Sequence, residues 1–431
     1  MNIKNPAISN NHLSSIVKYL MSIINGCQEK IPGKVLSTND LTDKFKEFIE
    51  SEDFMTPELR NEFDIINSTE NLFRNQVYTC METMLSMIEY LCTQLNIGNI
   101  SNISNNGDVY TWDELVANDT VVVTNNVVTS VDGISGLVII PEGITDIGSA
   151  FSGTDITKMY LPSTITKIDI NAFKNCTSLT HVEIPDTINT IGEFAFYSCI
   201  KLKKIHLPDS ITTIKDYAFG SCINLEDINL SNVKNIGLGV FDKCISIKNA
   251  DISSASIMSS IFKGCTSLET AILNTNLNEI KSMMFQDCTS LKEVIIPDNV
   301  TRIGEYAFGG CTNLININIP DNVSGFGSGA FYKCQSLEYI ELPDELTTIP
   351  DRLFSNCMNL KSITIPDSVT SIGEKSFEKC ISLEYIYIPH NVTYIADDAF
   401  VSSGIKYIGM SPDNPLYDEW KNKDYINIKT I

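Results

Sequence analysis

The chain has 431 residues, enough for two or three ordinary domains, and 43 % of them are hydrophobic, so a large core can form. Its net charge is −22 and its pI is about 4.5. Residues 1–100 carry 13 acidic and 8 basic side chains, a charge of −5, which leaves −17 for the remainder. Because an acidic surface repels phosphate groups, we expect no nucleic-acid partner and no insertion into a membrane.

The first residues of the chain, Met1 to Pro6, lack the apolar core of a secretion signal. No stretch reaches the 18 consecutive apolar residues that a membrane span needs. The sequence therefore predicts a protein without a signal peptide or transmembrane segment. We expect it to be made in the cytoplasm and either to stay there or to become part of a virion. A location on the cell surface is the less favoured expectation.

Residues 1–97 show a helical period and are predicted to form a helical anchor or oligomerisation region. The longest predicted helix covers residues 71–95, where apolar residues recur in steps of four and three, as in a heptad seam. The residues expected to mediate oligomerisation are Phe73, Val77, Met84, Met87 and Leu91. Because the apolar stripe is wider than a strict seam, an intramolecular bundle and a self-associating coiled coil both remain open.

Residues 98–140 are predicted to be a linker and an N-terminal cap. They are followed by a strict repeat over residues 141–410, in which ten cysteines recur every 21 to 23 residues. Each of these cysteines follows a phenylalanine by three positions. A fixed period of this length indicates a repeat architecture rather than a disulfide or metal framework. The cysteines are Cys176, Cys199, Cys222, Cys244, Cys265, Cys288, Cys311, Cys334, Cys357 and Cys380.

One full repeat runs from Ile191 to Pro208 and ends in the pattern Ile-x-Leu-Pro. The alternation predicts a short strand, and the proline ends it because it lacks an amide donor. The segment Ile191-Gly192-x-x-Ala195-Phe196 is predicted to turn the chain back, with the glycine at a bend and the phenylalanine in the core. One repeat cannot bury its own apolar face, so the repeats must stack into a solenoid.

The repeated phrase resembles the BspA-like, or Treponema-type, leucine-rich repeats over roughly residues 137 to 410. The resemblance implies a right-handed solenoid with a parallel sheet on its concave face, and roles in adhesion and protein recognition. Members of this family occur on bacterial surfaces, in protists and in phage proteins. The expected fold is thus α+β: about 12–13 solenoid coils with an α-helical N-terminal region.

The repeats through residues 222–265 are one or two residues short and lack the strand-ending proline, with Ser231, Ser253 and Asn274 in its place. We expect a local change in curvature or twist there, which is either tolerated drift or a functional kink. After the last repeat, residues 411–431 do not match the pattern and are predicted to form a C-terminal cap.

Recognition is expected on the concave sheet, where two rows of residues between the buried strand positions face solvent. The C-terminal third of these rows gathers Tyr339, Glu341, Tyr385, Tyr387 and Tyr407. Tyrosine is favoured in interfaces because it offers a large rigid surface with a polar tip, although it also simply favours strands. We therefore predict a protein or carbohydrate ligand at this cluster, with the strand-forming role as the alternative.

Sequence motifs for phosphate binding, zinc-dependent hydrolysis or nucleophilic catalysis are absent, and only four histidines are present. We expect no catalytic residues, no metal site and no cofactor. The sequence favours a non-enzymatic recognition or adhesion protein, anchored and assembled into a homo-oligomer through its N-terminal helices, such as a virion fibre or decoration protein of a phage. The alternatives are a cytosolic protein-interaction scaffold, an architectural spacer, or an effector whose activity lies in the N-terminal region.

Overall fold

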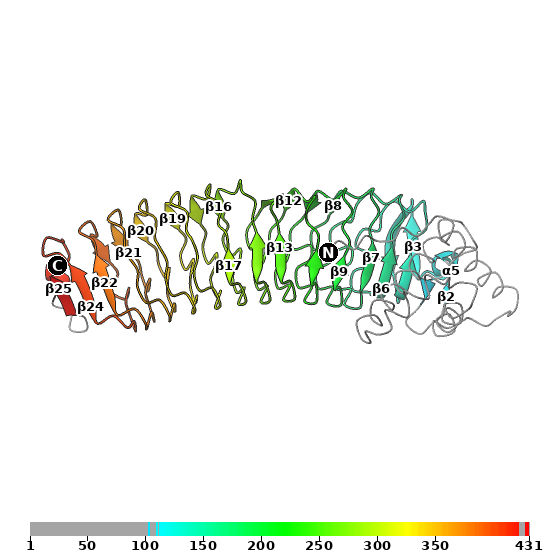
Figure 1. The fold of residues 1–431 in the computed structure, drawn as a ribbon. Coiled ribbons are helices and arrows are strands. Elements are labelled where there is room, and N and C mark those ends of the chain that lie inside the picture. The colour runs from blue at the N-terminus through cyan, green and yellow to red at the C-terminus, as the bar shows by residue number, and fades with distance from the viewer. Residues whose placement is uncertain (1–101, 104–108, 111, 422–426, 431) are drawn as a thin grey trace, which may run out of the picture. The chain divides into compact units, whose positions relative to one another are not determined.

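The computed structural model describes residues 102–103, 109–110, 112–421 and 427–430. From residue 135 onward these residues form stacked coils, drawn side by side in Figure 1. The helical region predicted for residues 1–97 lies outside the described residues, and so do Phe73, Val77, Met84, Met87 and Leu91.

Most coils contribute a short strand to a first ladder of parallel strands, formed by the Leu-x-x-Ile-x-Leu part of the repeat. Between β17 and β22 this ladder continues as the isolated parallel bridge Tyr339–Ser362. The predicted parallel-sheet solenoid of about 23-residue coils is therefore confirmed. The strands are β5 (Ser135–Ile139), β6 (Asp155–Tyr160), β7 (His181–Glu183), β9 (Lys204–Ile205), β11 (Asp227–Ile228), β13 (Asn249–Asp251), β15 (Thr270–Ile272), β17 (Glu293–Val294), β22 (Tyr385–Ile388), β24 (Tyr407–Met410) and β25 (Asn427–Thr430).

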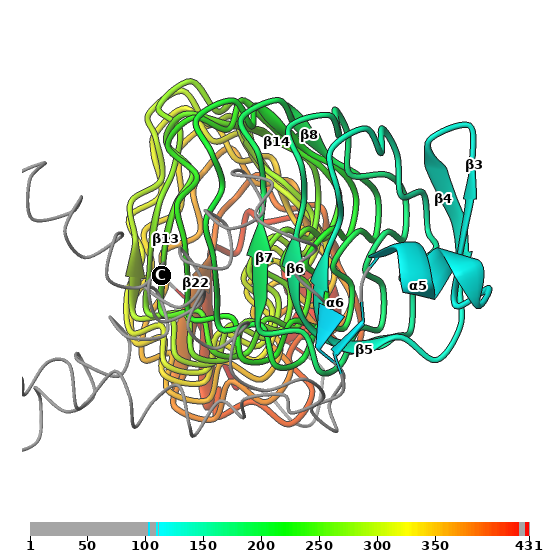
Figure 2. The ribbon, with the colours of Figure 1, turned by 90° about the vertical axis from the view of Figure 1, so that its right-hand side faces the viewer.

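A second ladder of parallel strands lies on another side of the coil, as the end-on view in Figure 2 shows for β8 and β14. The segment that starts at the repeated Ile-Gly was expected only to turn the chain, and this expectation was incomplete, because its Ile belongs to a strand, as Ile191 does to β8. The strands are β8 (Thr190–Ile191), β10 (Thr213–Ile214), β12 (Asn235–Ile236), β14 (Ser256–Ile257), β16 (Glu279–Ile280), β18 (Arg302–Ile303), β19 (Gly325–Phe326), β20 (Thr348–Ile349), β21 (Ser371–Ile372) and β23 (Tyr394–Ile395).

The repeated glycine next to the second ladder lies close to the preceding coil where it occurs, although Lys215, Lys281 and Pro350 take its place in other coils. A Cβ added to Gly192 would lie 2.5 Å from the carbonyl carbon of Asp169, and one added to Gly304 would lie 2.5 Å from the amide nitrogen of Ser282. Gly148, in the first coil, would meet nothing within 4 Å, although its φ of +47° is left-handed. The explanation of Gly192 and Gly304 by a bend was incomplete, because the backbone of the preceding coil also occupies the space of a Cβ at these two positions.

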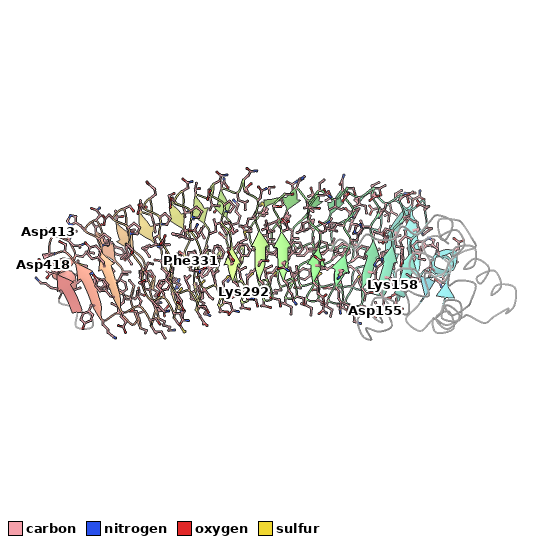
Figure 3. All side chains as sticks on the ribbon, in the orientation of Figure 1. Asp155, Lys158, Lys292, Phe331, Asp413 and Asp418 are labelled. Carbon is pink, nitrogen blue, oxygen red and sulfur yellow. The ribbon has the colours of Figure 1, made fainter. Side chains whose placement is uncertain are left out.

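The interior of the coils is a column of stacked phenylalanines beside a column of cysteines. From Phe173 to Phe400, neighbouring rings lie 5.2 to 5.9 Å apart; Figure 3 labels Phe331 within the stack. All ten repeat cysteines are buried and unpaired, as expected. Each thiol donates a hydrogen bond to the carbonyl of the phenylalanine in the preceding coil, as Cys199 does to Phe173 at 3.1 Å. The cysteine column therefore fills space and also satisfies buried carbonyl groups.

The short repeats differ from the others at the turn that follows the first ladder. A regular turn is closed by the amide of Ile211 donating to the carbonyl of Pro208, but in the next coil Val233 donates to Leu230. The turn thus starts one residue earlier, which means that the proline is deleted there rather than replaced by Ser231. The Asn229 side chain accepts a hydrogen bond from the Ser231 amide at 3.0 Å, so this amide of the shortened turn has a partner.

The turn after Ile252 follows the same rule, with Asp251 accepting from the Ser253 amide at 3.0 Å, whereas Asn274 does replace a proline. Both ladders are interrupted in this region: β11 is not hydrogen-bonded to β13, nor β14 to β16. The ladders are also interrupted at coils of regular length, between β7 and β9 and between β19 and β20, and the register is kept where the short coils pair, as between β12 and β14. The expected change in curvature or twist therefore stays a prediction.

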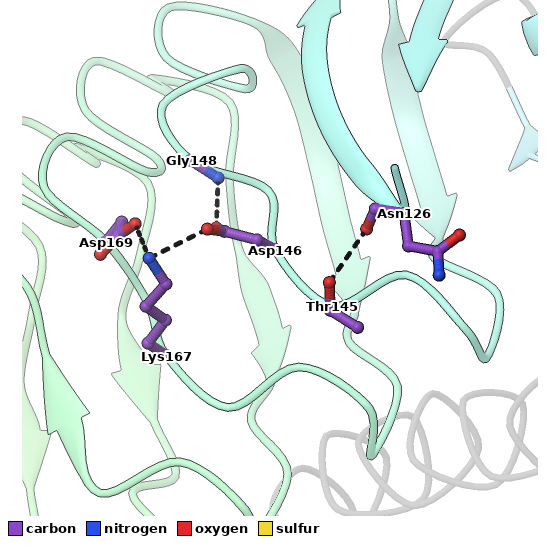
Figure 4. Close-up of polar contacts among 6 residues, drawn as sticks. All are labelled: Asn126, Thr145, Asp146, Gly148, Lys167 and Asp169. Carbon is purple, nitrogen blue, oxygen red and sulfur yellow. Dashed lines mark hydrogen bonds and ion pairs between the residues drawn. The ribbon is translucent and has the colours of Figure 1, made fainter. Parts of the chain in front are cut away.

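The N-terminal end of the stack is closed by elements that do not follow the repeat. β1 (Asn102–Ile103) pairs antiparallel with β5, and β2 (Val109–Tyr110) pairs with β1. α5 (Trp112–Ala117) and the hairpin of β3 (Val121–Thr124) and β4 (Val127–Val131) add Leu115, Val121 and Val128 to the core. Figure 4 shows how the hairpin joins the first coil, with the Thr145 hydroxyl donating to the Asn126 carbonyl at 3.3 Å.

The C-terminal end is closed by Trp420 of α6 (Tyr417–Trp420), whose ring meets Phe400 edge-on at 5.9 Å and ends the phenylalanine column. The buried Asn414 side chain donates to the Pro389 carbonyl at 2.8 Å, and β25 adds a further parallel strand to β24. Within the described part of the chain, no helix has the length and hydropathy to cross a membrane.

Candidate binding surface

The outer face of the first ladder exposes alternate residues in the middle strands, as in β15 and β22, because the residues between them point into the core. The predicted tyrosines lie on this face with exposed fractions of 54 % for Tyr339, 41 % for Tyr385, 37 % for Tyr387 and 39 % for Tyr407, and Glu341 is also exposed. Tyr385 and Tyr407 are register partners on adjacent strands. The cluster that the sequence predicted is thus assembled on one face by β22, β24 and the Tyr339 bridge.

Two positions that the sequence analysis would place on this face are buried. Tyr160 is 5 % exposed and clusters with Leu137 and Ile139, apart from the main core. Gly409, the register partner of Tyr387, is also buried. These two positions of the outward rows are therefore not accessible, although Tyr407 on the same strand as Gly409 is.

A column of alternating charge, which the sequence analysis missed, runs beside the tyrosines. It consists of the residue after each repeated Leu or Ile, and three ion pairs join its members across neighbouring coils: Lys292–Glu269, Lys361–Glu338 and Lys406–Glu384, each at 2.6 Å. Figure 3 labels Lys292 on this face. The column reads Lys203, Glu226, Lys248, Glu269, Lys292, Ile315, Glu338, Lys361, Glu384 and Lys406. The sequence alone could have revealed this column, because Lys and Glu alternate at the residue after the repeated Leu or Ile in successive 23-residue repeats.

The ion pairs shift the pKa values of their members. The hydrogen bond to Glu338 raises the pKa of the Lys361 ammonium, and the hydrogen bond from Lys292 lowers the pKa of the Glu269 carboxyl. Lys361 also lies 5.6 Å from the centre of the Tyr339 ring. Exposed pairs of this kind contribute little stability, but they neutralise the column locally.

Near the N-terminal end of this face, the histidine and carboxylate side chains do not converge in the number that binding a metal ion requires. His181 Nε2 lies 3.5 Å from Glu183 Oε2, a contact between two side chains only. In the part of the chain that the structure describes, no group of three or more His, Cys, Asp or Glu side chains could hold a metal ion. What this surface offers is aromatic, apolar and charged contact area.

The pattern of the BspA type leucine-rich repeat region matches the sequence in overlapping segments from residue 145 to residue 416, which is more than half of the chain. The chain belongs to this family. A comparison with curated proteins gives no match.

Solved structures show the same architecture. A leucine-rich repeat protein from Bacteroides ovatus aligns with a TM-score of 0.54 at 23 % identity, covering 71 % of this chain and 94 % of that one. A leucine-rich cell surface protein from Faecalibacterium prausnitzii has 25 % identity and a TM-score of 0.48, covering 70 % and 94 %. The B. ovatus likeness supports the fold of the repeat region.

Proposed function

We propose that this BspA-type leucine-rich repeat protein is a non-enzymatic recognition protein whose ligand binds the outer face of the first ladder. The observation that carries the proposal is the tyrosine cluster of Tyr339, Tyr385, Tyr387 and Tyr407 with Glu341. Four large aromatic side chains stay 37 % to 54 % exposed on one face of a rigid sheet. Such a patch suits a macromolecular surface, because rigid aromatic side chains lose little conformational entropy on binding.

The charges around the cluster favour a protein ligand. Lys361 and Lys406 are paired with Glu338 and Glu384, whereas Glu341 has no ion pair among the described residues. Glu341 therefore presents an acceptor to a partner that donates hydrogen bonds. Since the whole chain carries a charge of −22, a neutral or basic partner is favoured, and association weakens as salt rises.

The proposal extends to how the binding face is carried. We assign anchoring and homo-oligomerisation to residues 1–97, through the heptad-like residues Phe73, Val77, Met84, Met87 and Leu91, with a phage fibre or decoration protein as one form of such an assembly. Sedimentation of the full chain against its Met84→Lys variant tests this, because a charge in the seam should lower the mass of the assembly.

The binding proposal is tested with arrays of purified proteins and of glycans, probed side by side with the labelled full chain and a Tyr385→Ser, Tyr387→Ser variant. We expect a protein signal whose affinity falls by about 30-fold, equivalent to about 2 kcal/mol, in the double variant. Signals found only on the glycan array and lost in the variant would change the ligand class to carbohydrate.

The matched control is Tyr394→Ser. Tyr394 is 56 % exposed but lies in β23 of the second ladder, so its loss should leave the affinity unchanged. Equal losses in the Tyr394 variant and the double variant, or none in either, would show that the first-ladder tyrosines are not the site.

A further inference from the structure

Two neighbouring isoleucines, Ile272 and Ile295, are exposed on the first-ladder face, and Ile315 is exposed in the next coil, three positions earlier in its repeat. They lie at some distance along the stack from the tyrosine pair on β22. Ile272, Ile295 and Ile315 are 59 %, 77 % and 53 % exposed. The register of β15 and β17 pairs Ala271 with Val294, so Ile272 and Ile295 follow as neighbours on adjacent strands. With strands about 4.8 Å apart, three successive coils span roughly 10 Å along the stack, and the three-residue offset of Ile315 adds about 10 Å along the strand direction.

Ile315 occupies a position that carries charge in the neighbouring coils. It stands in the alternating column between Lys292 and Glu338. Lys292 forms its ion pair with Glu269 and Glu338 forms its ion pair with Lys361, so neither ion pair involves the coil of Ile315. The column is therefore neutralised on both sides of Ile315. The gap leaves an aliphatic surface where the repeat would otherwise place an ion-pair partner.

Carboxylates border the apolar patch. Asp251 is the register partner of Ile272, and Glu293 precedes Ile295 by two positions and so shares its face. Glu341 continues the same row two coils beyond Ile295. All three are exposed, and none is in an ion pair among the described residues. The patch is thus apolar at its centre and acidic at its border.

We propose that Ile272, Ile295 and Ile315 are a docking site for a protein segment that presents apolar side chains next to lysine or arginine. Aliphatic side chains offer no hydrogen bonds to a sugar, so the centre of the patch favours apolar protein side chains. The carboxylates around it favour basic flanks through charge complementarity. The site is separate from Tyr385 and Tyr387, and it stands whether or not those residues bind a ligand.

A library of random peptides displayed on phage, selected on the immobilised full chain at low salt, tests the proposal. We expect enrichment of peptides with apolar residues beside Lys or Arg, whose affinity falls about ten-fold or more in Ile295→Asp and falls as salt rises. The matched control is Ile381→Asp: Ile381 is 58 % exposed but follows Cys380 in a turn outside the ladder face. Thermal unfolding of each variant confirms that it is folded.

Several results would overturn the inference. Enrichment of acidic peptides would contradict the assigned charge, and equal binding to Ile295→Asp and wild type, or no enrichment at all, would contradict the site. Peptides that depend on Tyr385 and Tyr387 but not on Ile295 would support the tyrosine site and reject this one. Self-association of the full chain that is lost in Ile295→Asp would assign the patch to a second copy instead.

Discussion

The interior of the coils and the outer face of the first ladder are built from the same repeated unit. They differ in how regularly the same residue type recurs at equivalent positions. Inside, phenylalanine and cysteine recur coil after coil, because each side chain must pack against its own copy in the next coil. Outside, the equivalent positions hold Asp251, Ile272, Ile295 and Tyr387. Apart from the ion pairs of the charged column, no neighbouring coil constrains the outward residue, so the outer face can vary with the ligand.

The largest expected effect is a loss of folding stability at alkaline pH, because ionisation of each buried thiol destabilises the folded interior and these losses add up. Burial raises the pKa of Cys222 and Cys380 to about 12 from an ordinary value of 9.0. The folded chain holds these protons to higher pH than the unfolded chain does. The stability from the neutral thiols is therefore fully present below about pH 9 and is lost as the pH rises towards 12, by about 1.4 kcal/mol per pH unit for each thiol.

Urea unfolding of the full chain between about pH 8 and pH 10.5 measures this loss. A Cys222→Ala, Cys380→Ala variant serves as the control and should show a smaller decline over the same range. If both proteins declined equally, the thiols would not be the cause.

The second test removes one ring from the interior column. Phe308 stacks on Phe285 at 5.5 Å and on Phe331 at 5.6 Å, so Phe308→Ala should lower the free energy of unfolding by about 3–5 kcal/mol. Hydrogen exchange should accelerate in the adjacent coils as well. Phe194→Ala, at a partly exposed ring outside the column, should cost less. Unchanged exchange around Phe285 and Phe331 would argue against coupling through the column.

The third test adds a methyl group between coils. Gly304→Ala brings a Cβ within 2.5 Å of the Ser282 amide nitrogen and should cost about 1–3 kcal/mol. Gly325→Ala, where nothing lies within 4 Å, should instead stabilise the chain by about 0.4–1 kcal/mol, because it reduces the freedom of the unfolded chain. Chemical denaturation of the two variants compares them directly, and similar shifts would refute the stacking explanation.

The smallest effect on stability is expected on the outer face. Tyr385→Ser with Tyr387→Ser should lower the free energy of unfolding by less than about 1 kcal/mol, since both rings are at least 37 % exposed. A loss as large as that of Phe308→Ala would show that these tyrosines are structural. Their presence would then be explained by strand preference rather than by binding.

The sequence by itself determined the period, the phenylalanine and cysteine columns and the alternation that places Tyr339, Tyr385 and Tyr387 outside, because each of these follows from one repeat meeting identical neighbours. The family resemblance followed from the same columns. The sequence also located the irregular coils, although the deletion of proline before Ser231 became clear only from the turn hydrogen bonds.

Only the tertiary structure decided the features that depend on the register between residues about 23 positions apart. The second ladder forms because Thr213 and Ile214 lie beside Thr190 and Ile191. Gly192 is required because a neighbouring backbone occupies the space of its missing Cβ. The repeat period had already placed Ile272 next to Ile295 in one outward row, but only the structure shows that both side chains remain exposed there.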